Sequence, residues 1–360
     1  MFIKTFVATA LSALGFASAS DEIIAGETRN FAQDFTFTDE SGILIENPVI
    51  GVLTHPMMNY FIDKQAEYGL WSSYMSDATV KWIEASGGRA VPIQYYPPGD
   101  PNYRNEVVNN WLMDRINGLV LPGGAATSSD FRAWTKGLLE KAEAINDAGS
   151  HFPVFGLCLG MQHMIQVLGA SRSRREQDGT VLPMEWDMTY AELKNSKMFG
   201  GIQDDAIFDY LAQNDVAYHN PNWGIAPHKM NYSYIKNKYV HHSTNLECCG
   251  GTDRFVNSFE GLVHPFFGVQ FHPERSVGAM SKFHLFTHND QSFQFSRYLG
   301  DLLVSEARKS SQSFGYYNQE LAALVNRHPK TETNTYYGGV YLFDGSSQVN
   351  VMESTTSYLV

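Results

Sequence analysis

FPVFGLCLGMQ, residues 152–162, is the stretch of sequence that decides the fold. Its first part, Phe152 to Leu157, is a continuous apolar run, which is typical of a strand buried on both faces of a parallel sheet. The segment from Leu159 to Leu168 has the pattern of a helix. Cys158 is therefore predicted at a tight turn from strand to helix, with a glycine two residues away on either side.

The segments on both sides of this turn repeat the alternation of strands and helices. We expect strands at 49–53, 90–93, 116–121 and 266–271, and helices at 72–86, 131–148 and 293–310. Between 171 and 260 the pattern is less regular, with short strands and polar loops. Strands and helices that alternate at short spacing predict an α/β fold, with a doubly wound, mostly parallel central sheet and helices on both faces.

The length of 360 residues suits one large domain with additions at its ends. We expect a leader segment at 21–46, the α/β domain at 47–310, and a C-terminal extension at 311–360 that packs on the same domain. Hydrophobic residues make up 43% and charged residues 18%, which is typical of a globular chain and excludes a disordered one. The net charge of −12 argues against nucleic acid as a partner.

Residues 1–20 have the pattern of a secretory signal peptide. Lys4 precedes an apolar run from Phe6 to Ala17, and small residues follow where a signal peptidase would cut. A run of about a dozen apolar residues is too short to span a membrane as a helix. We therefore expect the protein to enter the secretory pathway without a membrane anchor, where Asn231-Tyr232-Ser233 becomes a candidate glycosylation site.

Three cysteines are too few for a disulfide-stapled scaffold. Cys248 and Cys249 are adjacent, and because a disulfide between neighbours is strained, free thiols or bonds to another chain are expected for them. Cys158 therefore needs a reason to stay free in an oxidising compartment.

Cys158 has the setting of a nucleophile. A side chain at the apex of a strand-to-helix turn lies at the carboxyl edge of the sheet, where open α/β sheets place their sites. The helix N-terminus favours the thiolate, which is the reactive form of cysteine. The alternative interpretation is a small buried hydrophobic residue. The flanking glycines and the predicted elements favour the nucleophile.

A base and an oxyanion site are expected at neighbouring strand ends. His272 directly follows the predicted strand 266–271, so its imidazole should lie at the same edge as Cys158, and Glu274 can orient the ring. Gly123 and Gly124 follow another strand and can expose backbone amides. The Gly124 amide and the Leu159 amide are the two predicted oxyanion donors.

Together these motifs resemble the class I glutamine amidotransferase-like superfamily, which has a flavodoxin-like fold and a Cys-His-Glu triad. Within it, the sequence most closely resembles the γ-glutamyl hydrolase, or folylpolyglutamate hydrolase, family. The segments that carry the resemblance are 48–53, 86–92, 117–124, 152–160 and 268–274, with 305–309 and 341–344 in the extension. It covers roughly residues 48–344, nearly the whole chain after the signal peptide.

The resemblance implies a cysteine-dependent hydrolase that cleaves γ-glutamyl peptide bonds, above all those of folylpoly-γ-glutamates, without metal or organic cofactor. It also implies a homodimer, a secreted, lysosomal or vacuolar location, and a place at the substrate cleft for Tyr68 and His219. A basic group should bind the anionic substrate, and Arg89 and Arg275 are candidates by position. Two alternatives are a glutaminase that releases ammonia from glutamine and a catalytically silent secreted binding protein.

Overall fold

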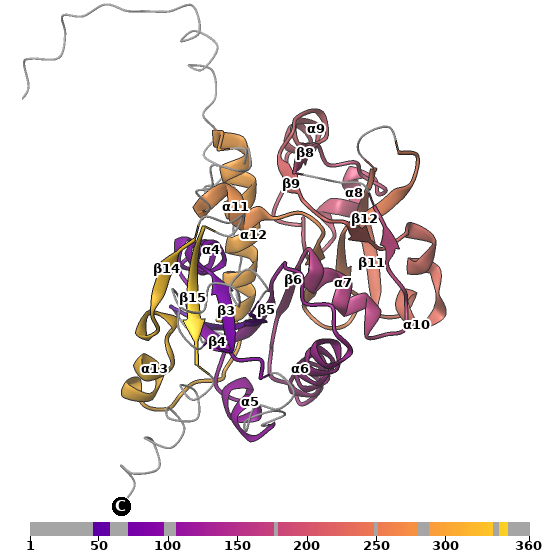
Figure 1. Cartoon of the computed structure of the whole chain (residues 1–360). Coiled ribbons are helices and arrows are strands. Elements are labelled where there is room, and N and C mark those ends of the chain that lie inside the picture. The colour runs from indigo at the N-terminus through magenta and orange to yellow at the C-terminus, as the bar shows by residue number, and fades with distance from the viewer. Residues whose placement is uncertain are drawn as a thin grey trace, which may run out of the picture. The chain divides into compact units, whose positions relative to one another are not determined.

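The computed structural model describes residues 46–57, 71–96, 106–175, 179–247, 251–278, 288–333 and 338–344. In this part of the chain a sheet of seven strands forms the centre (Figure 1). Its order is β11 (Tyr239–Leu246), β12 (Arg254–Gly261), β13 (Phe266–Val269), β6 (Val154–Leu157), β5 (Gly118–Leu121), β1 (Val49–Leu53) and β4 (Arg89–Ile93). The strands from β13 to β4 are parallel, whereas β12 and β11 are antiparallel. The predicted α/β fold with a mostly parallel sheet is confirmed.

Helices pack on both faces of the sheet. One group consists of α5 (Glu106–Met113), α6 (Ser129–Asp147) and α7 (Leu159–Gln166). The other consists of α4 (Asp77–Ala85), α11 (Pro273–Gly278) and α12 (Asp290–Arg308). Neighbouring residues of β6 illustrate the division, because successive side chains of a strand point to opposite faces. Val154 lies in a hydrophobic cluster with residues of the first group, whereas the ring of Phe155 lies 5.5 Å from that of Trp82 in α4.

A smaller sheet corrects the predicted helix at 72–86. Residues Ser73–Ser76 form strand β3, and α4 begins only at Asp77. This sheet has the order β14 (Lys330–Glu332), β15 (Gly339–Phe343), β3 and β2 (His55–Pro56). Because β3 pairs with β15, more than 260 positions away in sequence (for example Tyr74 with Leu342), the local pattern could not indicate the strand. The described part of the C-terminal extension thus packs on the α/β domain.

The region from 171 to 260 is more regular than predicted. Its strands β11 and β12 have eight residues each and pair antiparallel, although only short strands were expected there. The other strands are β7 (Ser173–Arg174), β8 (Thr180–Leu182), β9 (Ala217–His219) and β10 (Trp223–Gly224). The helices of the region are α8 (Tyr190–Lys194), α9 (Asp205–Gln213), η2 (Pro227–Asn231) and α10 (Ser233–Lys236), and the extension adds α13 (Tyr317–Ala323) and η3 (Val325–Arg327).

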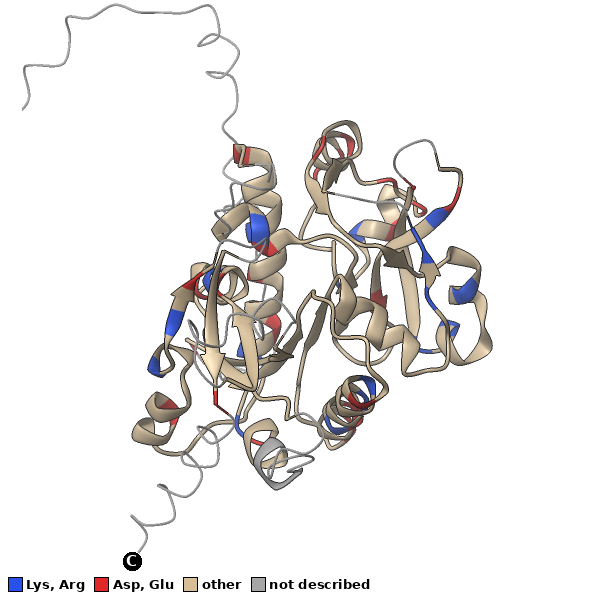
Figure 2. Ribbon diagram, in the orientation of Figure 1, with Lys and Arg blue, Asp and Glu red and all other residues tan. Residues whose placement is uncertain are grey.

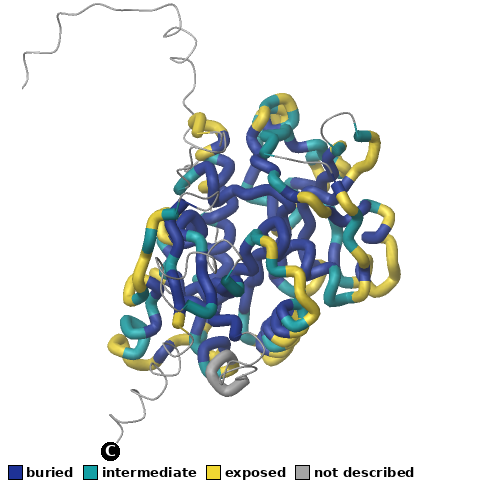
Figure 3. The backbone as a smooth tube through the Cα atoms, in the orientation of Figure 1, coloured by how far each residue is buried: buried dark blue, intermediate teal, exposed yellow. Residues whose placement is uncertain are grey.

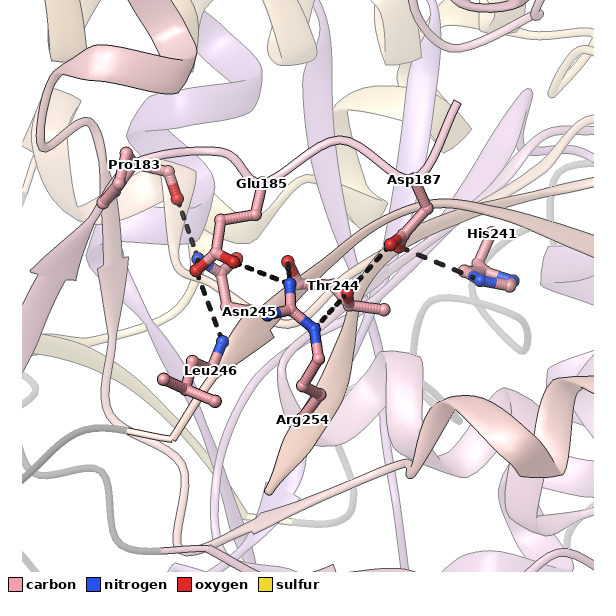
Figure 4. A network of polar contacts seen from close by, with 8 residues as sticks. All are labelled: Pro183, Glu185, Asp187, His241, Thr244, Asn245, Leu246 and Arg254. Atoms are coloured by element: carbon pink, nitrogen blue, oxygen red, sulfur yellow. Dashed lines mark hydrogen bonds and ion pairs between the residues drawn. The ribbon is translucent and has the colours of Figure 1, made fainter. Parts of the chain in front are cut away.

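A polar network fastens the segment 183–187 to β11 and β12 (Figure 4). Arg254 Nη2 donates to Glu185 Oε2 at 2.6 Å, and Asn245 Nδ2 donates to the Pro183 carbonyl at 2.9 Å. Thr244 Oγ1 donates to Asp187 Oδ1 at 3.1 Å. These bonds join loop and strands through several side chains, so this part of the structure is held as one unit.

The central strands are buried, and exposed residues lie on the outer helices and loops (Figure 3). Strands β1, β5, β6 and β13 contain no Lys, Arg, Asp or Glu, which agrees with burial on both faces (Figure 2). Among the described helices, none has the length and apolar character needed to cross a membrane. The predicted signal peptide and the leader up to residue 45 lie outside the described residues.

Candidate active site

Cys158 lies at the turn between β6 and α7, as the strand and helix pattern indicates. Its φ is 48° and its ψ −103°, and among the described residues other than glycine it alone has a positive φ. Such a conformation costs on the order of 1–3 kcal/mol, which the surrounding packing must supply. The Cys158 amide donates to the Val269 carbonyl at 2.8 Å, so the turn is bonded to the end of β13. Its side chain is free of any disulfide and buried, with 6% exposure.

The two glycines around Cys158 are required by close packing. A Cβ on Gly156 would lie 2.7 Å from the Met161 amide nitrogen, inside the first turn of α7. A Cβ on Gly160 would collide with the Leu121 carbonyl oxygen at the end of β5. The Gly-x-Cys-x-Gly pattern therefore lets α7 approach the ends of two strands closely enough to bring Cys158 to the edge of the sheet.

His272 and Glu274 lie at the end of β13 and form a buried pair. His272 Nδ1 lies 2.8 Å from Glu274 Oε1, and the His272 amide donates to the Tyr218 carbonyl at 2.8 Å. Arg275 Nε lies 3.4 Å from the same carboxylate oxygen. Because Glu274 engages Nδ1, the other ring nitrogen of His272 is left for a partner, and the imidazole makes a side-chain hydrogen bond with Cys158.

The pair has strongly perturbed electrostatics. Burial lowers the pKa of His272, but the charges of Glu274 and Cys158 and their hydrogen bonds outweigh it and raise the pKa to about 9. Burial raises the pKa of Glu274, yet the neighbouring His272 and Arg275 bring it below the usual value. The arrangement thus favours an imidazolium between a carboxylate and the sulfur of Cys158.

The predicted oxyanion residues lie against these side chains. A Cβ on Gly123 would lie 3.1 Å from Cys158 Cβ and would collide with the His272 ring. Within the described residues, the Gly124 amide has no backbone acceptor. Leu159 is buried and begins α7 directly after Cys158. The structure therefore brings Gly123, Gly124 and Leu159 to the same strand ends as Cys158 and His272.

Of the residues that the family resemblance implied, His219 lies near His272. It is fully buried in β9, and burial, followed by the charge of His272, lowers its pKa to about 3, so this imidazole is neutral. Its ring contacts Phe255 and Phe271, with centroid distances of 5.6 and 5.8 Å. Tyr68 lies outside the described residues.

The two arginines expected to bind substrate are placed elsewhere, and both expectations were wrong. Arg89 is the first residue of β4 and pairs with Glu320, at the edge of the parallel sheet opposite to Cys158. Arg275 is buried beside Glu274. In neither case could position in the sequence tell which edge of the sheet, or which neighbour, the side chain would meet.

The remaining predicted positions lie away from these strand ends or outside the described residues. Asn231 is exposed at the end of η2. Cys248 and Cys249 lie outside the described residues. Within the described part of the chain, no group of three or more His, Cys, Asp or Glu side chains is placed to hold a metal ion.

His55 is a site residue that sequence reasoning missed. It follows β1 and lies under the oxyanion loop, with its ring 2.8 Å from the position of a Cβ on Gly124. Burial lowers its pKa to about 4, against the backbone of Pro122 and Gly123, which raises it. A signal was available, because His55 closely follows a predicted strand at the same edge of the sheet as Cys158.

The fold and the nucleophile turn define a class of protein, and the comparisons agree with it. The model of the family described as glutamine amidotransferase class-I matches residues 91–291 of this chain. The solved structure of a GMP synthase protein from Thermoplasma acidophilum covers 71% of this chain, and 94% of that chain is covered. It has 16% identity and a TM-score of 0.37, and no conclusion rests on it.

Curated relatives narrow the class. Gamma-glutamyl hydrolase of Mus musculus is 30% identical over 305 residues, which cover 83% of this chain and 90% of that protein. The Homo sapiens protein of the same name is 25% identical, with 84% and 92% covered. Gamma-glutamyl hydrolase B of Dictyostelium discoideum is 25% identical, with 83% and 84% covered. This chain belongs to the gamma-glutamyl hydrolase family.

Proposed function

We propose that this protein hydrolyses γ-glutamyl peptide bonds with Cys158 as nucleophile and His272 as general acid and base, and that its substrates are folylpoly-γ-glutamates. The observation that carries the proposal is the contact between Cys158, at positive φ on the helix N-terminus, and the His272–Glu274 pair. Membership of the gamma-glutamyl hydrolase family supports the choice of bond.

The proposed reaction has two steps. The Cys158 thiolate attacks the side-chain carbonyl carbon of a γ-linked glutamate, and the Gly124 and Leu159 amides stabilise the oxyanion. The carbon–nitrogen bond then breaks, the leaving amine takes the proton from His272, and a γ-glutamyl thioester remains on Cys158. Water then gives a proton to His272 and attacks the thioester, which releases the glutamyl carboxylate and restores the thiolate.

His272 suits both roles because Glu274 holds its Nδ1 and favours the protonated ring. The imidazolium is ready to protonate the leaving amine, and the neutral ring formed by that transfer is ready to activate water. The contact of Gly123 with both side chains leaves the reacting groups side by side.

The test is incubation of the protein with p-aminobenzoyl-penta-γ-glutamate and, separately, with glutamine, followed by mass spectrometry. We expect shortened polyglutamates from the wild type and none from Cys158→Ala, and the product lengths distinguish endo- from exo-cleavage. Ammonia from glutamine without peptide cleavage would instead identify a glutaminase. No product from either compound with folded protein would refute the enzyme.

We also propose that the protein is routed through the secretory pathway by residues 1–20. The exposed position of Asn231 is compatible with glycosylation there. Expression in a eukaryotic host tests both points. We expect a secreted or vacuolar product that lacks the first 20 residues or so and that loses mass after Asn231→Gln. Retention of the intact N-terminus in the cytosol would contradict the routing.

A further inference from the structure

Arg172, in the loop after α7, is held in place against the helix that begins at Cys158. Its Nη1 donates to Gln162 Oε1 at 3.0 Å, and Gln162 lies one turn into α7, four residues after Cys158. The guanidinium carbon lies 5.4 Å from the ring centre of Trp223. A hydrogen bond and a stacked ring together fix the direction of this long side chain.

Gln162 connects this arginine to the strand end that carries His272. Its Nε2 donates to the Trp223 carbonyl at 2.6 Å and to Gln270 Oε1 at 3.1 Å. Gln270 is fully buried and lies two residues before His272. The guanidinium is therefore tied, by short bonds, to elements that position both Cys158 and His272.

The positive charge of Arg172 is not neutralised by the protein. Within the described residues neither Arg172 nor Arg132 of α6 forms an ion pair, although both are only partly exposed. Burial and then the repulsion from Arg132 lower the pKa of Arg172, whereas the charge of Cys158 raises it. Two guanidinium groups without a carboxylate are unusual in a chain with a net charge of −12. An anion from outside the protein would relieve their repulsion.

We propose that Arg172, assisted by the charge of Arg132, binds the α-carboxylate of the γ-glutamyl group whose side-chain carbonyl Cys158 attacks. This assignment rests on the proposed function. In a γ-glutamyl group, three carbon atoms separate the reacting carbonyl from the α-carboxylate. This reach is comparable to the helical turn of about 5.4 Å that separates Cys158 from the residue holding Arg172. The planar guanidinium can offer two parallel N–H groups to a carboxylate.

The kinetic test uses two γ-glutamyl peptides that differ only at the donor residue, one with a free α-carboxylate and the other with an α-carboxamide. We expect Arg172→Met to lower kcat/KM for the carboxylate peptide by about 10- to 100-fold, mainly through KM, because a hydrogen bond to a charged group is lost. The carboxamide peptide should change less than about threefold. Arg172→Lys should retain part of the preference. Equal losses for both peptides, or none, would overturn the proposal.

Arg115 provides a matched control. It too is a half-buried arginine stacked on a tryptophan, with its guanidinium carbon 4.4 Å from the ring centre of Trp111. It precedes β5, at the edge of the sheet opposite to Cys158. Arg115→Met removes the same charge and the same kind of stacking, so it should leave the preference for the carboxylate peptide unchanged.

A binding measurement separates this inference from the proposed function. Cys158→Ala and Cys158→Ala/Arg172→Met are titrated with the carboxylate peptide by calorimetry. We expect the double variant to bind about tenfold or more weakly. If the wild type cleaves neither peptide but this difference is found, the proposed activity fails and the carboxylate site stands. If the wild type cleaves the carboxylate peptide and Arg172→Met binds and cleaves it normally, only the carboxylate site fails.

Discussion

Cys158 carries its side chain in a backbone conformation that glycine alone adopts without strain. The strain predicts a difference between two inactive variants. Cys158→Gly should be more stable than Cys158→Ala by about 1 kcal/mol, because glycine relieves the positive φ whereas alanine keeps it. Urea unfolding of both variants measures the difference.

Ala133 in α6 provides the control for this comparison. It is exposed in the interior of a helix, so Ala133→Gly should destabilise the protein by about 1 kcal/mol. The sign is opposite to that expected at Cys158. If glycine were less stable than alanine at both positions, the turn at Cys158 would not be strained.

The ionisation of His272 gives a second prediction at this scale. Its pKa of about 9 depends on Glu274 and Cys158, so its NMR titration should move to lower pH in Cys158→Ala and in Glu274→Gln. An unchanged midpoint in Cys158→Ala would contradict the ion pair with the sulfur.

The same shift affects stability. The folded state raises the pKa of His272 above its ordinary value of 6.5, so it binds the proton more tightly than the unfolded chain. This stabilisation is fully present below pH 6.5 and is lost as the pH rises through about 9. Urea unfolding from pH 6 to 9 should therefore show a decrease for the wild type that is smaller in Cys158→Ala.

At the scale of the elements, the position of α7 depends on close approach to β5. Gly160→Ala would force a methyl group against the Leu121 carbonyl oxygen, which is backbone and cannot move aside cheaply. We expect a loss of about 1–3 kcal/mol and a large loss of activity, because Cys158 moves with the helix. Chemical unfolding and the polyglutamate assay measure the two effects.

Gly137→Ala is the matched control, because it makes the same change in the interior of another helix. Gly137 is exposed in α6, and a Cβ there would meet nothing within 4 Å. It should stabilise the protein by about 1 kcal/mol without changing activity. A Gly160→Ala variant as stable and active as wild type would show that α7 need not approach the strand end so closely.

At the scale of the whole molecule, the C-terminal extension completes a sheet that begins in the first part of the domain. β15 pairs with β3, and Leu342 is buried with Tyr74 and Val340. Leu342→Ala should cost about 2–4 kcal/mol and lower the midpoint of a single unfolding transition. An early separate transition would mean that the extension unfolds independently. Leu246→Ala, at a 43% exposed position, should cost little.

Much of the fold and of the candidate site could be predicted from local sequence. The apolar runs of β1, β5, β6 and β13 are long enough to indicate buried parallel strands. Three of the site motifs directly follow such strands. Cys158, Gly123 and His272 could therefore be assigned to one edge of the sheet without coordinates, because the carboxyl ends of parallel strands share that edge. What failed was β3, where pairing with β15 overrides a local pattern of helical spacing.

The sequence by itself determined which residue types could perform the chemistry and at which strand ends they stand. Only the tertiary structure decided which charges meet. Arg275 lies beside Glu274, Arg89 lies at the far edge, and Arg172 lies against the helix of Cys158. The physical reason is that strand and helix patterns are local in sequence, whereas the partner of a charged side chain is set by segments packed from elsewhere. Loops such as 171–175 carry no periodicity that would reveal that partner.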